Sequence, residues 1–432
     1  MKLPVIAFRN IGRNSRRSLL SGAAIAVATL VIVFMFSAIE GIKVDVARNI
    51  HTYVSGHIRI RNQEYERYEK LNPLHLGIPD YRTVVSELER GDDTRLVLPR
   101  IRFFTAVYRE EANYRGVGLG LDFERELDLR RAQTDAFRLD ASRLDAFAEA
   151  WDLPFHAGEL PRSGEKEILM SKGLAEEIGV EIGDKVTLFT KTAFMGMQAW
   201  TFRVTGIILF SIHSMNSRFF LAPLDSTQRF LKMDRAGDSV TEILVFMENT
   251  RDLESAASRI GGGLRGETAE SLSVKSWRSI GTFHALVTMM ETVYNIIAFV
   301  FFLLGTTVIV NTTMMVIYER MKEIGTIAAM GMTGGEIVVL FFLEALFIAV
   351  AAGLAGTLAG IGLVLPLSLS GIDFGAAMEG VDMGISSVIY PILNLRSTVF
   401  VFLYSVVVAA LASFLPTIKA ARVEPVEALR TV

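Results

Sequence analysis

The sequence predicts an α-helical membrane protein with four transmembrane helices and a large mixed α/β (α+β) extracytoplasmic domain between the first and second of them. Two features of the chain predict this class. Hydrophobic residues make up 51% of the 432 residues and gather at the N-terminus and over roughly the last third, which leaves a polar middle. Both apolar regions contain uncharged runs of about 20 residues, the length that crosses a bilayer core.

The composition excludes several classes of protein. The net charge of -3 is too small to indicate a nucleic-acid partner or an acidic substrate. The chain has no cysteine, which excludes disulfides, thiolate zinc sites and cysteine nucleophiles. None of these absences determines the cellular compartment.

The first 18 residues interleave basic and apolar side chains, as in an amphipathic helix on a membrane surface. An alternative is the positively charged start of a signal peptide. Residues 19–39 carry no charge, and this run is longer than the apolar core of a cleaved signal, about 7–15 residues. We therefore expect an amphipathic helix at 1–18 and a first transmembrane helix at 19–42. The arginines should keep the N-terminus in the cytoplasm.

The polar segment 43–284 is large enough for one or two globular lobes. Residues 55–61 alternate polar and apolar side chains, like a half-buried strand. A helix is expected at 80–90, with Asp80 as its N-cap and Gly91 beyond its end. This part of the segment therefore predicts an α/β lobe.

A second pattern follows further along the same segment. Residues 96–110 are expected to form strands interrupted at Pro99. Short strands between turn residues predict a β-rich lobe at about 155–235. Strand and helix patterns resume at 240–275. We therefore expect a discontinuous α/β lobe that is interrupted by the β-rich one.

Three further apolar segments predict the remaining membrane helices. They lie at 285–318, 337–371 and 397–418, so four spans return the C-terminus to the cytoplasm. The tail 419–432 carries three basic side chains, whereas the outer loop 372–396 carries one arginine and three acids. This charge difference agrees with the positive-inside rule.

The third span contains two features that suggest helix contacts or chemistry. Ala352, Gly356 and Gly360 recur at four-residue spacing, and small residues allow helix backbones to approach closely. This face packs either within the chain or against another subunit. Glu344 lies about two turns inside the cytoplasmic end, and an ionisable group in a span is a functional candidate. Pairing near the interface is favoured over proton relay, because no second acid in the spans forms a chain with it.

Motifs typical of enzymes are absent from the sequence. The chain contains no HExxH zinc motif, no GxSxG nucleophile elbow and no GxxxxGK[ST] phosphate-binding loop. We therefore expect no catalytic residue, no metal site and no cofactor bound by this chain.

A short charged segment, 319–336, joins the second and third spans. Met321, Ile324 and Ala328 fall on one helical face, and the charged residues lie mostly off that face. We expect these apolar side chains to dock in a partner, so that displacement passes to two rigid helices. A solvated turn with incidental periodicity is the alternative.

Two local signals mark the end of this short helix. Gly331 can stop it. The sequence from Thr333 to Glu336 has the S/T-x-x-E form of a capping box, so the third membrane helix is expected to start there. We refer to 319–336 as the elbow.

The elbow resembles the cytoplasmic signature of FtsX-like permeases, the MacB, LolC and LolE type of ABC transporter subunit. The resemblance rests on residues 318–332, YERMKEIGTIAAMGM. The segment SKGLAEEIGVEIGDKVTLFT at 171–190 and the tail AARVEPVEALR at 420–430 are similar to the same family. The expected order of one span, a large outer domain and three spans also agrees. Without a phosphate-binding loop, the layout resembles the separate-subunit LolC/LolE arrangement.

The resemblance implies a permease of the bacterial inner membrane whose large domain faces the periplasm. Two permease chains, identical or different, would pair and bind two copies of a separate ABC ATPase, which holds ATP and Mg²⁺. In the lipoprotein-releasing branch, the acyl chains of a lipoprotein sit between the first and second helices and leave toward a periplasmic carrier chaperone. The alternatives are a MacB-like exporter with a periplasmic adaptor and an FtsX-like regulator of a cell-wall hydrolase.

Two sets of side chains are candidates for this function, the first from their position in the spans and the second by residue matching to the family. Phe34, Met35, Met290, Tyr294 and Ile297 lie near the expected outer ends of the first two spans, where they suit acyl chains and bulk lipid equally well. The residues implied for coupling to the ATPase are Glu319, Arg320, Met321, Lys322, Glu323, Ile324, Gly325, Ile327, Ala328, Met330 and Gly331.

Overall fold

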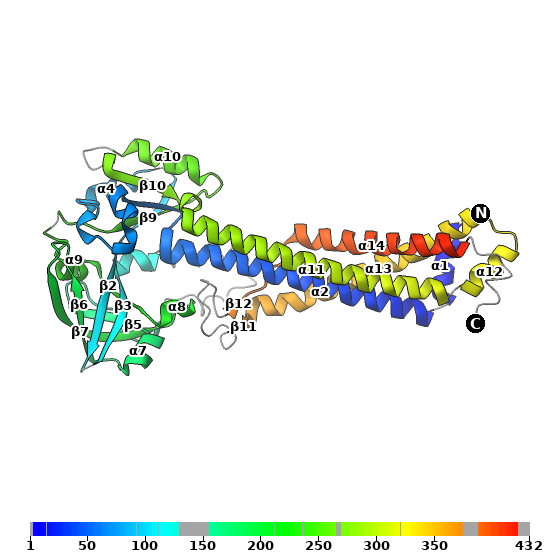
Figure 1. The fold of residues 1–432 in the computed structure, drawn as a ribbon, viewed down its shortest axis with the longest axis horizontal. Coiled ribbons are helices and arrows are strands. Elements are labelled where there is room, and N and C mark those ends of the chain that lie inside the picture. The colour runs from blue at the N-terminus through cyan, green and yellow to red at the C-terminus, as the bar shows by residue number, and fades with distance from the viewer. Residues whose placement is uncertain are drawn as a thin grey trace. The chain divides into compact units, whose positions relative to one another are not determined.

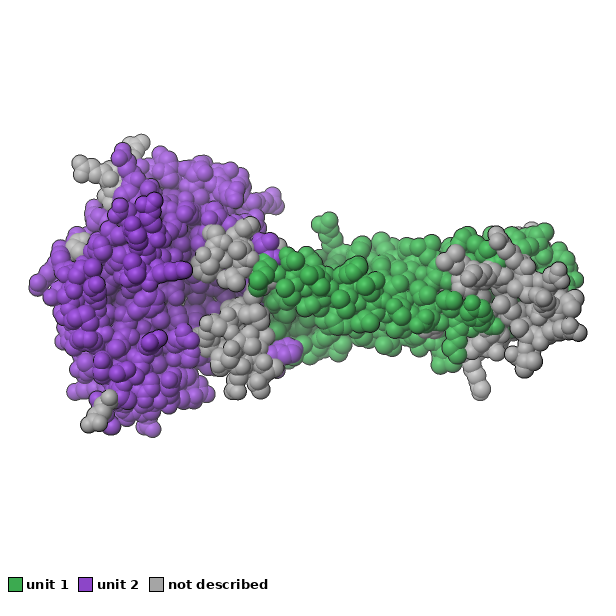
Figure 2. Space-filling model, in the orientation of Figure 1, with its two compact units in different colours: residues 1–43, 289–372, 389–432 green, residues 44–288, 373–388 purple. Residues whose placement is uncertain are grey.

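A computed structural model describes residues 3–13, 15–91, 93–110, 112–128, 155–210, 212–235, 237–264, 269–319, 321–374 and 388–421. The chain separates into two compact units (Figure 2). Unit 1 comprises residues 1–43, 289–372 and 389–432, and unit 2 comprises residues 44–288 and 373–388.

Unit 1 is helical (Figure 1). Two of the boundaries between the units fall inside long helices, α2 and α11, so that each of these contributes to both units. The helices are α1 Leu3–Arg13, α2 Ser15–Ile50, α11 Gly281–Glu319, α12 Met321–Ala329, α13 Gly334–Ser370 and α14 Leu395–Ala421. A helix is therefore confirmed within the expected amphipathic segment at the N-terminus.

Three helices in the described part of the chain are long and apolar enough to cross a membrane. They are Ser18–Ser55, Gly334–Ser370 and Leu395–Phe414, and they correspond to the first, third and fourth expected spans. The second expected span lies in α11, a helix of 39 residues. Its described apolar stretch, Thr292–Val308, is shorter than the three helices above, which are long enough to cross a membrane. A count of four spans is therefore not confirmed.

The small residues of α13 pack against α2 of the same chain. A Cβ atom added to Gly356 would lie 2.3 Å from the carbonyl oxygen of Ala26, and one added to Gly360 would lie 3.0 Å from Val33. Only a glycine allows the backbones to approach this closely. For these two positions, the structure therefore places the small-residue face in an intramolecular contact.

A polar contact joins α11 to α14 inside unit 1. The hydroxyl of Tyr404 donates to the carbonyl oxygen of Phe302 at 3.2 Å and is also hydrogen-bonded to the hydroxyl of Thr306. The rings of Phe302 and Tyr404 meet edge to face, with centroids 4.3 Å apart. Because an apolar surrounding offers no water, the tyrosine hydroxyl needs partners of this kind.

The loop before α14 packs tightly on α2. The N–H of Ile392 donates to the carbonyl oxygen of Ser37 at 2.9 Å. A Cβ atom on Gly41 would lie 2.1 Å from the carbonyl oxygen of Tyr390. This crossing therefore requires glycine at position 41.

Unit 2 is built around a ten-stranded sheet, and a separate two-stranded sheet pairs β11 Ile372–Asp373 with β12 Val388–Ile389 (Figure 1). The strands of the large sheet are β1 Ile58–Asn62, β2 Thr94–Arg109, β3 Ala112–Leu121, β4 Phe155–Gly158, β5 Glu167–Ser171, β6 Lys185–Lys191, β7 Met197–Ile208, β8 Phe219–Pro223, β9 Glu242–Met247 and β10 Leu272–Ser276. The helices around it are α3 Gln63–Arg67, α4 Tyr81–Leu88, α7 Lys172–Ile178, α8 His213–Asn216, α9 Leu224–Leu231 and α10 Leu253–Gly263.

The order of the strands confirms that the α/β part is discontinuous in sequence. The order is β10-β1-β9-β2-β3-β8-β5-β7-β4, with β6 pairing β2 and β7. Strands from before residue 110 therefore lie beside strands from after residue 240.

The β-rich segment does not form a separate lobe, and that prediction is wrong. Its strands belong to the same sheet. One hydrophobic core joins Ile60 of β1, Phe103 of β2, Val186 of β6 and Phe230 of α9. The reason is the length of β2, which pairs with β9 at its start and with β3 and β6 further along. The long strand β2 thus pairs both with a strand of the α/β part and with strands of the β-rich segment.

Two local predictions for unit 2 need correction: the break at Pro99 is wrong, and Asp80 does occupy the N-cap position of α4 but does not cap it with its side chain. Pro99 does not interrupt β2, since it pairs with Ile243 of β9 while pairing with β3 begins only at Arg100. A proline is tolerated in a strand where one edge is open. Asp80 precedes α4 but makes no side-chain capping bond. Its φ of +46° differs from the extended geometry of an N-cap, and its N–H donates instead to the carbonyl oxygen of Gly237.

Candidate functional site

The elbow consists of the helix α12 and a turn, as the sequence predicts. Gly331, with a φ of +96°, ends the helix in a backbone conformation that glycine adopts without strain. The N–H of Thr333 donates to the carboxylate of Glu336 at 3.0 Å, and these two residues form the capping box that opens α13. Both sequence predictions are confirmed.

The apolar face of α12 packs inside the chain. Ile324 is only 1% exposed and clusters with Ile337 and Phe341 of α13. Ile327 and Ala328 pack against the same cluster. Because the turn folds α12 back onto the first turns of α13, the apolar stripe is buried without a partner. The expectation that Ile324 docks in a partner protein is therefore wrong.

The opposite face of α12 is open. Thr326 and Ala329 are exposed, and Met330 is 75% exposed. Their spacing of three and four residues places them on one side of the helical turn. We call these three residues, of which Met330 directly follows the last residue of the helix, the outer face of α12. Met330 was among the predicted residues, whereas Thr326 and Ala329 were missed. Their position two and five residues after the buried Ile324 is the signal that would have found them.

The remaining residues of the predicted coupling set differ in how far they are buried. Gly325 is buried, Glu323 is half-buried and Gly331 is exposed. Arg320 lies outside the described residues, as do the side chains of Glu319, Met321 and Lys322.

The residues predicted to contact acyl chains do not gather into one described cluster. Phe34 and Met35 of α2 and Tyr294 of α11 are half-buried, and Ile297 is 37% exposed. The side chain of Met290 lies outside the described part of the chain. A hydrophobic cluster does join α2, α11 and α14, but it consists of other residues: Ile32, Val33 and Val401, with Phe36, Phe302 and Tyr404 around them. Glu344 is buried in α13, with 2% exposure.

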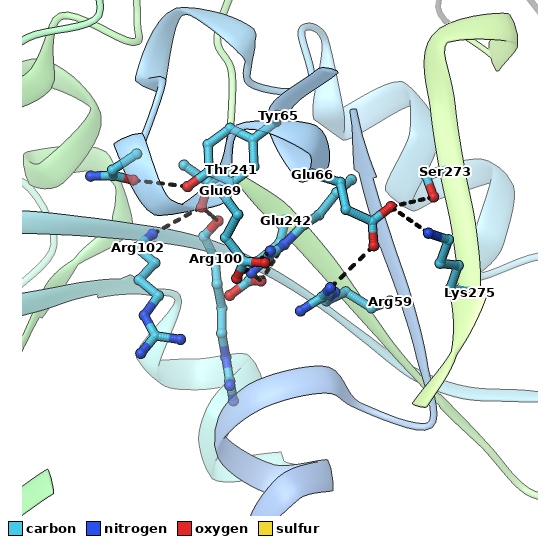
Figure 3. A network of polar contacts seen from close by, with 12 residues as sticks. Arg59, Tyr65, Glu66, Glu69, Arg100, Arg102, Thr241, Glu242, Ser273 and Lys275 are labelled. Carbon is cyan, nitrogen blue, oxygen red and sulfur yellow. Dashed lines mark hydrogen bonds and ion pairs between the residues drawn. The ribbon is translucent and has the colours of Figure 1, made fainter. Parts of the chain in front are cut away.

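A second notable site is a buried ion-pair network on one face of the sheet of unit 2 (Figure 3). Arg61 of β1 donates from Nε to Oε2 of Glu242 in β9 at 2.9 Å, and both residues are 2% exposed. Nη1 of Arg61 also lies 2.8 Å from the carboxylate of Glu69. Arg59, two residues before Arg61, pairs with Glu66 of α3 at 3.3 Å.

The network keeps its members charged. Burial alone would raise the pKa of Glu242, but Arg61, Arg59 and Arg102 outweigh it and hold that pKa below its ordinary value. Burial would likewise lower the pKa of Arg61, but the carboxylates of Glu242 and Glu69 raise it above its ordinary value. Removing one partner of such a pair leaves a buried charge and costs about 3–5 kcal/mol.

Sequence reasoning missed this network. The alternation at 55–61 was interpreted as a half-buried strand with a polar face, yet Arg59 and Arg61 are each only 2% exposed. The described residues contain no group of three His, Asp or Glu side chains that could hold a metal. The network joins β1 to β9 and to α3 through paired, buried charges.

Comparison with known proteins identifies the two halves of this architecture. A family model described as the MacB-like periplasmic core domain matches residues 18–262, more than half of the chain. A second, the FtsX-like permease C-terminal, matches residues 295–425.

Individual relatives are distant. The chain is 23% identical over 283 residues to the lipoprotein-releasing system transmembrane protein LolC of Xylella fastidiosa, covering 62% of this chain and 66% of LolC. It is 26% identical over 258 residues to the uncharacterized ABC transporter permease YknZ of Bacillus subtilis, covering 56% and 58%. Among solved structures, the periplasmic region of MacB from Actinobacillus actinomycetemcomitans aligns with a TM-score of 0.36 at 12% identity, covering 57% of this chain and 97% of that one. The chain thus spans less than two thirds of the length of these curated relatives, 66% of LolC and 58% of YknZ.

Proposed function

The chain belongs to the family of ABC transporter permeases with a MacB-like periplasmic core domain and an FtsX-like C-terminal region, and we propose that it releases lipoproteins from the bacterial inner membrane. The observation that supports this substrate is the similarity to LolC, which extends over 283 residues. In this function the permease binds lipoprotein acyl chains between α2 and α11, and unit 2 faces the periplasm. It then passes the lipoprotein to a periplasmic carrier.

In this proposal the elbow is the part of the permease that contacts the ATPase. Two permease chains pair and bind two copies of a separate ABC ATPase in this proposal, which the match to the FtsX-like permease C-terminal over residues 295–425 supports. We assign the ATPase contact to the outer face of α12, where Met330 is 75% exposed. The buried face of α12, through Ile324, passes displacement to α13. Ile324 thus keeps a role in coupling, as internal packing.

Depletion of the permease tests the substrate. Lipoproteins destined for the outer membrane should accumulate in the inner membrane, and separation of the two membranes on a density gradient measures this. Normal distribution of lipoproteins after depletion would contradict the proposed substrate. Purification in mild detergent should recover a P-loop ATPase with wild-type chains, and its absence would contradict the ABC transporter assembly.

A MacB-like exporter is the second candidate. The match of the MacB-like periplasmic core domain over residues 18–262 favours it. In that case the permease would work with a periplasmic adaptor. Depletion would then cause sensitivity to drugs or peptides while lipoproteins remain correctly sorted, so the same strain distinguishes the two functions.

A further inference from the structure

The turn that directly follows α2 departs from α-helical geometry, so a different backbone carbonyl group accepts the N–H of Gly56. Residues His51–Ser55 form a π-helical turn that ends at Gly56. In an α-helix the N–H of Gly56 would donate to the carbonyl oxygen of Thr52. Here it donates to the carbonyl oxygen of His51 at 3.0 Å instead. Single π turns of this kind occur often at functional sites.

A buried guanidinium group takes the place of that donor. Nη1 of Arg100 in β2 donates to the carbonyl oxygen of Thr52 at 2.8 Å. The other two guanidinium nitrogens bind the carboxylate of Glu126 at 2.7 and 2.8 Å. Arg100 and Glu126 are 3% and 5% exposed. A positive charge is also favourable beside the C-terminal end of a helix.

Arg100 lies at the point in β2 where the pairing changes. It is the last residue to pair with β9 and the first to pair with β3. Its carbonyl oxygen accepts from the N–H of Thr241 at 3.1 Å. Beyond it, β2 continues to the region that pairs with β6. The same residue therefore contacts the end of α2 and lies where the two halves of the sheet meet.

We propose that Arg100, held by Glu126, is the positioning residue that couples the end of α2 to β2. Movement of α2 would then carry both halves of the sheet as one body. This inference rests on the proposed function, in which ATP-driven motion reaches unit 2. The neighbouring Arg61–Glu242 pair is equally buried but binds no carbonyl of α2 in the described contacts, so it provides a matched control.

The absence of cysteine allows a direct measurement in the full-length permease with its ATPase in nanodiscs. Spin labels at Ala47 in α2 and Phe194, which is 60% exposed, report the separation of α2 from the β6–β7 turn. A second pair, Phe194 and Leu395, reports movement of that turn relative to α14. Distances are compared between nucleotide-free and vanadate-trapped complexes. The variants are Arg100→Met with Glu126→Leu, and Arg61→Met with Glu242→Leu.

In the wild type we expect a shift for the Phe194–Leu395 pair on trapping and a constant, narrow distribution for the Ala47–Phe194 pair. The Arg100/Glu126 variant should lose the shift of the Phe194–Leu395 distance and broaden the Ala47–Phe194 distribution. The Arg61/Glu242 variant should behave as the wild type. Retention of the shift in the Arg100/Glu126 variant, or its loss in both variants, overturns the proposal. Absence of the shift in the wild type contradicts the proposed function itself.

Discussion

Replacing Ile324 by alanine tests whether the elbow depends on its internal packing. Ile324 is 1% exposed and packs against Ile337 and Phe341. A buried isoleucine replaced by alanine costs about 2–5 kcal/mol. The cluster has only three buried members, and Met332 at its edge is half-buried. Since such a site can relax into part of the space, we expect a cost near the lower end, about 2 kcal/mol.

Amide hydrogen exchange measures this loss of stability in the elbow itself. The amides of α12 and the following turn exchange through local opening, so their rate reports the free energy of that opening. A loss of about 2 kcal/mol makes exchange about 30-fold faster, because 1.4 kcal/mol corresponds to a factor of ten. Strands of unit 2 should be unaffected, and they serve as an internal reference.

A matched substitution on the other face of the same helix is Met330→Ala. Met330 is 75% exposed, so exchange in the elbow should stay as in the wild type while binding of the ATPase weakens. Unchanged exchange in Ile324→Ala, or equal acceleration in both variants, would refute the assignment of the two faces.

Three further predictions concern other parts of the chain. Gly41→Ala should lower the stability of the permease in detergent by about 1–3 kcal/mol through overpacking, measured by thermal unfolding. The reason is that the added Cβ would lie 2.1 Å from a carbonyl oxygen of the loop before α14. Gly22→Ala is the control and should be close to neutral, because the nearest contact of its Cβ is at 3.7 Å. The pKa of Glu242 in the folded chain lies below its ordinary value, because Arg61, Arg59 and Arg102 outweigh the effect of burial. Its contribution to the stability of unit 2 is therefore present above about pH 5 and is lost as the pH falls further, because the unfolded state then binds more protons. Thermal unfolding of unit 2, followed by its β-sheet circular dichroism, should show this loss, and an unchanged profile after the apolar double substitution at this pair would speak against it. Tyr404→Phe removes the hydrogen bond to Thr306 and should cost about 0.6 kcal/mol, measured by unfolding in mixed micelles, with no change expected if the contact is absent in the bilayer.

Features that depend on neighbouring residues could be predicted from the sequence. The end of α12 at Gly331 and the capping box of Thr333 and Glu336 need only a few residues on either side, and both are present. The strand at 55–61 was likewise found from its alternation and appears as β1. The discontinuous α/β part followed from the return of the same pattern after residue 240.

Features that depend on distant contacts could not be predicted. The periodicity of α12 shows that one face is apolar, but it does not show whether α13 or another protein covers that face. The sequence therefore located the short helix and its apolar face. It assigned that face to a partner protein, whereas in the structure the face packs on α13. Arg59 and Arg61 in an alternating strand indicate a polar face, and their burial depends on carboxylates that the fold brings to them, among them Glu242 far along the chain.

The sequence by itself indicated a membrane protein with a large polar domain, because hydropathy over about 20 residues is sufficient for that, and its motifs resembled those of FtsX-like permeases. The tertiary structure decided which residues can act. It buried Ile324, exposed Met330 and brought Arg100 to the end of α2. The physical reason is that burial and pairing belong to contacts between segments far apart in the chain, whereas periodicity belongs to a segment alone.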